Sequence, residues 1–270
     1  MRRTTALLGT VALLAGCGGK TEPAGNETKP ANQQAAVRVV AREYAYVMPD
    51  RIVGGVVSME FVNAGDELHE FALGRLAPGV TPEQARQELT DGDGDPGPEL
   101  VEDIGGVPFL TPGKRVTVTR KLSEGTYVLL CFIPAPDGRP HIEHGMIRSF
   151  KIEGDSGKDL PKPDAVIIAR TARFDVPVLH AGRQTIELRN AAREDRGFVL
   201  MGLKPGKTPK DVDAWLEAGG SGPAPVTFPG GIQSIPSGTS VFEELRLEAG
   251  TTYYLLEDEH GLRATFTPQR

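Results

Sequence analysis

The stretch from Gly125 to Glu153, GTYVLLCFIPAPDGRPHIEHGMIRSFKIE, contains two apolar segments separated by a loop with proline, aspartate and glycine. The segments, Thr126–Phe132 and Ile147–Ile152, are rich in β-branched and aromatic residues and are typical of β-strands bounded by turns. Four side chains that bind soft metal ions lie at the end of the first segment and in the loop, namely Cys131, His141, His144 and Met146. This stretch therefore predicts two strands whose connection carries a group of metal ligands.

A related pattern occurs twice along the chain. The sequence SMEFVNAGDELHEFALGRLAPGVTPEQARQEL of residues 58–89 matches TIELRNAAREDRGFVLMGLKPGKTPKDVDAWLEAG of residues 185–219, and EGTYVLLC of residues 124–131 matches AGTTYYLLE of residues 249–257. Each copy contains a Thr-Pro pair, which predicts a helix with threonine as its N-cap and proline at its first position. The shared order of turn, helix and strand predicts two homologous halves.

The fold class follows from the segments between these turns. Five strands are expected in the first copy: Val37–Val40, Val56–Asn63, Arg115–Leu122, Thr126–Phe132 and Ile147–Ile152. Because glycine, proline and aspartate separate them, we expect an antiparallel Greek-key β-sandwich with one short helix at about Pro82–Leu89. The second copy predicts another sandwich of the same kind, so the fold class is all-β.

The N-terminus resembles a bacterial lipoprotein signal. Arg2 and Arg3 precede a short apolar run, and the run ends in Leu14-Ala15-Gly16-Cys17, which resembles a lipobox. The resemblance implies export, lipid attachment at Cys17 and a membrane anchor on the extracytoplasmic side. An ordinary signal peptide with an incidental cysteine is the alternative.

From the N-terminal signal and the two homologous halves, we expect the chain to divide into five parts. They are a signal peptide (1–17), a flexible tether without large apolar residues (18–36), a first domain with the candidate metal ligands (37–153), a linker (154–164) and a second domain without those ligands (165–268). Composition sets further bounds: the net charge of -6 and the lack of a basic cluster with aromatic residues argue against nucleic-acid binding.

A metal explains the unpaired cysteine. The chain has two cysteines, and a lone thiol such as Cys131 in an exported protein is open to oxidation unless a metal binds it. A thiolate, two imidazoles and a thioether form the trigonal His₂Cys set with a weak axial methionine that blue-copper sites use. His69, in a loop after a strand, supplies the further imidazole.

These residues resemble the copper loop of the cupredoxins, over residues 37–153 in full and over 165–268 as a degenerate copy. The resemblance implies one type-1 copper ion held by the ligands His69, Cys131, His141 and Met146. It also implies that Asn63 bonds across the two ligand loops. The gap between Cys131 and His141 is longer than in small cupredoxins and looks like that of copper nitrite reductases. His144 stays open as an alternative ligand, although the spacing of His141 from Met146 fits the family better.

The second copy departs from this pattern. Arg196 takes the position of His69, and Glu257 takes that of Cys131. We therefore expect no copper there, and we expect His180 and His260 to face solvent.

A calcium loop is a weaker candidate. Acidic residues at Asp91, Asp93, Asp95 and Glu102 fit an EF-hand spacing, but Pro96 takes the place of the required glycine. An acidic loop without calcium is therefore the favoured interpretation.

The preferred function is a single-electron carrier in the cell envelope, tethered near a redox protein partner that the sequence does not identify. Copper handling without electron transfer, and a non-redox interaction module, are the alternatives. We expect no enzymatic activity, since copper oxidases and nitrite reductases need further histidines and this chain has five.

Overall fold

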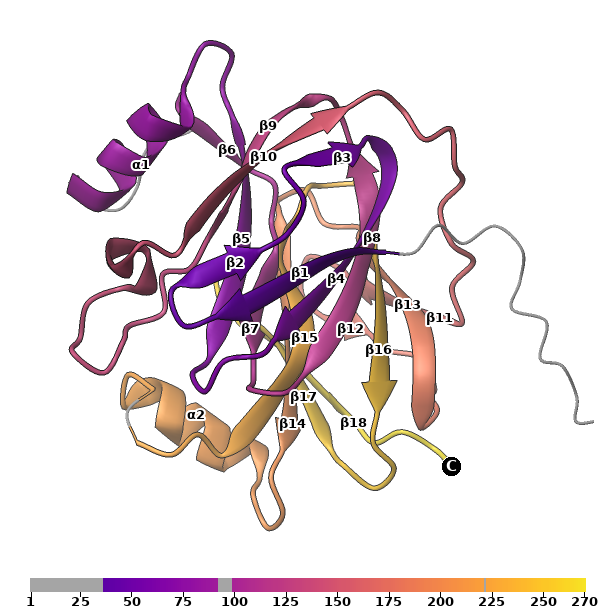
Figure 1. The fold of residues 1–270 in the computed structure, drawn as a ribbon. Coiled ribbons are helices and arrows are strands. Elements are labelled where there is room, and N and C mark those ends of the chain that lie inside the picture. Colours follow the sequence, from indigo (N-terminus) through magenta and orange to yellow (C-terminus); the bar gives the residue numbers. More distant parts are fainter. Residues whose placement is uncertain (1–35, 92–98, 221) are drawn as a thin grey trace, which may run out of the picture. The chain divides into compact units, whose positions relative to one another are not determined.

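The computed structural model describes residues 36–91, 99–220 and 222–270 (Figure 1). The expected signal peptide, Cys17, the tether up to residue 35 and residues 92–98 of the acidic stretch lie outside the described residues, so the anchor and the calcium loop are untested. Among the described residues, no helix has the length and apolar character needed to cross a bilayer.

The first half is built from short strands and two helical segments. Its elements are β1 (Val37–Arg42), β2 (Ala45–Val47), β3 (Arg51–Val53), β4 (Gly55–Asn63), β5 (His69–Leu76), α1 (Pro82–Asp91), β6 (Val101–Asp103), β7 (Val107–Leu110), β8 (Arg115–Leu122), β9 (Gly125–Leu130), the 3₁₀ segment η1 (His141–His144) and β10 (Ile147–Glu153). The five predicted strands are all present. The predicted helix is present and two residues longer than expected.

The second half has a similar order with fewer elements. Its elements are β11 (Ala165–Ala169), β12 (Phe174–Asp175), β13 (Gly182–Asn190), β14 (Arg196–Leu203), α2 (Pro209–Glu217), β15 (Val226–Ile235), β16 (Ser240–Leu247), β17 (Tyr253–Glu257) and β18 (Leu262–Phe266). Helix α2 begins as predicted, with Thr208 as N-cap in a capping box with Asp211. The all-β class with two sandwiches and short inserted helices is therefore confirmed.

Each half has two facing sheets. In the first half, β4 lies between β1, which is parallel to it, and β8, which is antiparallel. The other sheet places β9 between β5 and β10, both antiparallel. Apolar side chains of both sheets, among them Phe61, Phe71 and Leu129, are buried together in one core. Strands therefore form where apolar and polar residues alternate, because successive side chains of a strand point to opposite faces and only one face is buried.

The two halves share equivalent hydrogen bonds at Asn63 and Asn190. The side-chain amide of Asn63 donates to the carbonyl oxygens of Glu67 and Leu110, at 2.8 and 2.7 Å. That of Asn190 donates to the carbonyl oxygens of Glu194 and Ile235, both at 2.8 Å. The same asparagine therefore closes the same loop in both halves.

Equivalent strands also join the halves. Strand β8 pairs antiparallel with its counterpart β16, so one sheet of eight strands runs through both halves (Figure 1). Strand β7 lies beside its counterpart β15, with backbone bonds from Gln233 to Gly106 and from Thr111 to Phe228, at 2.8 and 3.1 Å. The described residues from 36 to 270 form one compact unit. The domain boundaries expected from the sequence thus remain a prediction.

Candidate metal centre

Three of the predicted ligands lie together in the first half. His69, Cys131 and His141 are fully buried, and each offers a ligand atom within 4.8 Å of the others. Nδ1 of His141 lies 3.3 Å from Sγ of Cys131. The rings of His69 and His141 have centroids 5.1 Å apart.

Two neighbouring strands supply the first two residues. His69 begins β5, and Cys131 directly follows β9, which pairs antiparallel with β5. The backbone N–H of Glu70 donates to Sγ of Cys131 at 3.4 Å. The strand ladder thus sets the separation of the imidazole and the thiol before any metal binds.

The long loop after Cys131 folds back to bring in His141. Pro134 and Pro140 form an isolated bridge, which closes the extra residues of the loop into a turn. The N–H of His141 donates to the carbonyl of Ile133 at 2.9 Å. The ten-residue separation in sequence between Cys131 and His141 is therefore compatible with direct contact.

The donor set fits copper. Both ring nitrogens of His69 are buried without a hydrogen-bond partner among the described residues. Unpaired buried nitrogens cost free energy unless another group, such as a metal ion, binds them. Met146 is fully buried in the same apolar cluster as Cys131, and its N–H donates to the carbonyl of His141 at 3.0 Å. A thiol and two imidazoles are the three strong ligands of a type-1 site, and Met146, five residues after His141, is the thioether expected from the sequence.

Burial sets the protonation of this group. Burial raises the pKa of the Cys131 thiol to about 12. Burial, together with the neighbouring His141, lowers the pKa of His69 to about 4. The imidazole is thus neutral at pH 7, as a metal ligand must be, and the thiol needs a positive charge beside it to ionise.

The other nitrogen of His141 meets a carboxylate. Nε2 of His141 lies 2.9 Å from Oε2 of Glu67. The ring of Tyr44 packs edge-on against His141, with centroids 5.0 Å apart, and its hydroxyl donates to Glu67 at 3.4 Å. A carboxylate on the distal nitrogen orients a histidine ligand and makes it more basic.

His144 lies outside the ligand group. Its Nε2 is 3.1 Å from Oδ1 of Asp137, and its ring stacks on Tyr44 with centroids 4.6 Å apart. Of the two candidate histidines, the structure brings His141 to the thiol.

Asn63 differs from its expected role. Its amide bonds the loop that leads into His69 and the carbonyl of Leu110, and its Oδ1 accepts from Gly65 at 3.0 Å. In the described part of the chain its partners belong to the His69 loop and β7, and not to the loop after Cys131. Asn63 thus orders one ligand loop, where a bond across both was expected.

Tyr44, Glu67 and Glu70 contact the ligand group, but sequence reasoning did not single them out. Glutamate and tyrosine are common surface residues, and their positions carry no motif. Tyr44 is the one non-glycine residue with positive φ, 60°, among the described residues. Such a conformation is costly for an aromatic residue and often marks a functional site.

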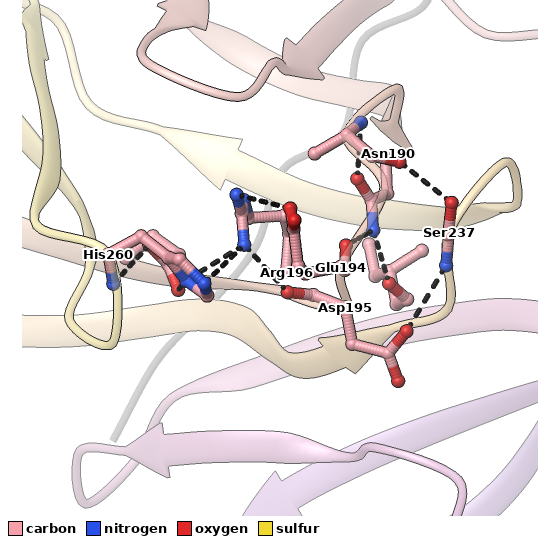
Figure 2. Close-up of polar contacts among 9 residues, drawn as sticks. Asn190, Glu194, Asp195, Arg196, Ser237 and His260 are labelled. Atoms are coloured by element: carbon pink, nitrogen blue, oxygen red, sulfur yellow. Dashed lines mark hydrogen bonds and ion pairs between the residues drawn. The ribbon is translucent and has the colours of Figure 1, made fainter.

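The equivalent place in the second half holds a different set (Figure 2). The Arg196 side chain is only 1% exposed; its Nη1 lies 3.0 Å from Nε2 of His260, and its Nη2 lies 3.1 Å from Glu194. Nδ1 of His260 lies 3.0 Å from Oε1 of the buried Glu257. The guanidinium cation of Arg196 thus contacts His260 and Glu194 at the place where the first half has His69. His180 and His260 are both exposed, as expected, and His260 also has these two partners.

No protein-family model matches the chain, and no curated protein matches it. Among solved structures, reduced auracyanin from the photosynthetic bacterium Roseiflexus castenholzii is 20% identical, with a TM-score of 0.31, over 45% of this chain and 99% of that one. A multicopper oxidase is 16% identical, with a TM-score of 0.26, over 86% of this chain and 88% of that one. The copper nitrite reductase of Nitrosomonas europaea is 14% identical, with a TM-score of 0.27, over 87% of this chain and 94% of that one.

These comparisons correct one expectation from the sequence. Copper enzymes stand beside a blue-copper protein among the similar structures, so the expectation that the chain is not an enzyme is wrong. At these identities and TM-scores the likeness assigns no activity to this chain. The fold itself is cupredoxin-like.

Proposed function

We propose that the protein binds one type-1 copper ion and uses it to transfer single electrons. The ligands are His69, Cys131 and His141, with Met146 as the weak fourth. The observation that carries the proposal is the buried His–Cys–His group, in which neither nitrogen of His69 has another partner among the described residues. Copper held by these residues would supply one-electron chemistry, because it has two oxidation states one electron apart.

The residues around His141 support an electron path. The Tyr44 ring contacts both His141, which is fully buried, and His144, which is partly exposed. Packed rings form a short route from the buried ligand to the surface. Glu67 holds the distal nitrogen of His141, so the ligand needs little reorganisation when the charge of the ion changes.

We further propose that the protein works outside the cytoplasm, held to a membrane by lipid on Cys17. The Leu14-Ala15-Gly16-Cys17 motif supports this placement. Such a tether would keep the site near a membrane-bound redox partner. Expression in a bacterial host with Cys17→Ala tests it, because the variant should leave the membrane fraction while the wild-type protein remains there.

The copper proposal is tested by visible absorption of the full chain with Cu(II). A strong thiolate-to-copper band is expected for the wild-type protein and for Cys17→Ser, and its loss is expected in Cys131→Ser. Cys17→Ser is the matched control, because these are the two cysteines of the chain. A folded wild-type protein without the band would overturn the proposal.

A further inference from the structure

Gln233 of the second half is connected by hydrogen bonds to Glu70, which lies beside the Cys131 thiol. Glu70 directly follows the ligand His69, and its N–H donates to Sγ of Cys131. Its carboxylate accepts two hydrogen bonds: Oε2 from the N–H of Phe132 at 2.8 Å, and Oε1 from the side-chain amide of Gln233. Since Phe132 directly follows Cys131, this one carboxylate connects the thiol's own loop to the second half.

Gln233 is itself held in place by Gly106. The N–H of Gln233 donates to the carbonyl of Gly106 at 2.8 Å, and its Oε1 accepts from the N–H of Gly106 at 3.1 Å. A side chain at Gly106 would begin 1.8 Å from the carbonyl oxygen of Phe71, and one at Gly105 would begin 2.2 Å from that of Ser234. Glycine at 106 therefore allows its close approach to β5 within the first half, and glycine at 105 allows the close approach to Ser234 of the second half.

The hydrogen bond between Gln233 and Glu70 has no counterpart, among the described residues, at the equivalent place around Arg196. Leu110 and Ile235 occupy the same place, opposite His69 and Arg196 respectively. By this correspondence, the counterpart of Gln233 is Pro108. The counterpart of Glu70 is Gly197, which follows Arg196. Neither proline nor glycine has a polar side chain, so the symmetric link is absent from the half without the copper ligands.

We propose that Gln233 is a positioning residue for the copper centre, and that through it the copper-free second half supports the site in the first half. This inference rests on the proposed copper function. The amide of Gln233 fixes the Glu70 carboxylate, and the carboxylate fixes the Phe132 N–H beside Cys131. Outer hydrogen bonds of this kind set the orientation of metal ligands, and their loss typically costs 10- to 100-fold in metal affinity.

Gln233→Met tests the link, because methionine keeps the length of the side chain and removes the N–H donor to Glu70, together with the oxygen that accepts from Gly106. The matched control is Thr111→Val, which removes the hydroxyl that accepts from the N–H of Phe228 at 2.8 Å across the same pair of strands. Copper affinity, the visible band and the reduction potential are measured on the full chain.

We expect Gln233→Met to weaken copper binding about tenfold and to shift the visible band, with both unchanged in Thr111→Val. In a Glu70→Ala background, Gln233→Met should cause no additional change, because the two residues act through one contact. A wild-type band with equal effects of Gln233→Met and Thr111→Val would overturn this inference alone. A wild-type protein without the band would overturn the copper function and the inference with it.

Discussion

Oε2 of Glu67 lies 2.9 Å from Nε2 of His141, while Nδ1 of the same ring lies 3.3 Å from the thiol of Cys131. The imidazole therefore bridges a carboxylate and the proposed copper position. Only one imidazole ring separates the Glu67 carboxylate from the proposed copper position. Glu67 should therefore influence both the copper affinity and the reduction potential of the site.

Glu67→Gln should lower copper affinity about tenfold and raise the reduction potential. The potential rises because loss of a negative charge disfavours the more positive, oxidised ion. Asp137→Asn, which alters the partner of His144, is the control and should change neither quantity. Voltammetry and copper titration measure the effects, and equal results for the two variants would contradict this role.

His141→Ala should abolish the strong visible band, whereas His144→Ala should preserve it. The reason is that His141 is buried beside Cys131, while His144 is partly exposed and contacts Asp137. Absorption spectra of both variants with Cu(II) decide the point. The reverse result would make His144 the ligand.

Asn63→Ala and Asn190→Ala should both destabilise the fold by about 1–3 kcal/mol, since each leaves buried carbonyl groups without a donor. The two side chains make equivalent bonds, so the variants form a matched pair. Only Asn63→Ala should also weaken copper binding, because only its loop leads into His69. Urea unfolding and copper titration separate the two effects, and weaker copper binding in Asn190→Ala would refute the assignment.

Arg196→Ala should destabilise the protein by about 2–4 kcal/mol, because it empties a buried volume and removes the contacts to His260 and Glu194. Arg193→Ala, at an exposed position in the same loop, should change stability by less than about 0.5 kcal/mol. The copper spectrum of both variants should equal that of the wild type. A copper band lost in Arg196→Ala would show that the second half acts on the site by a route other than Gln233.

Glu243 should make stability depend on pH. Burial raises the pKa of Glu243 from 4.5 to about 7, and the bond from the N–H of Gly231, at 2.7 Å, opposes this only in part. Between these values the folded state binds more protons than the unfolded state, so stability falls as pH rises from about 4.5 to 7, by about 3 kcal/mol.

The measurement is urea unfolding at a series of pH values for the wild type and Glu243→Gln. The difference between the two curves isolates Glu243 from other titrating groups. Glu244→Gln, at the neighbouring and partly exposed position, should keep the wild-type dependence. A wild-type dependence retained in Glu243→Gln would disprove the assignment.

The sequence by itself determined the local elements. Alternation of apolar and polar residues specified β4 and β8, and the Thr-Pro pairs specified the starts of α1 and α2. The order of Cys131, His141 and Met146 around two strands also indicated the chemistry of the site. These features are readable because each depends on residues close together in the chain.

Only the tertiary structure decided which side chains meet. The bridge between Pro134 and Pro140 brings His141 to the thiol, and the positive φ of Tyr44 accompanies the packing of its ring against His141. Gln233 reaches Glu70 across 163 residues because β15 lies beside β7. Such contacts follow from the pairing and packing of distant segments, which local periodicity does not encode, since a strand's pattern specifies its buried face but not its neighbour.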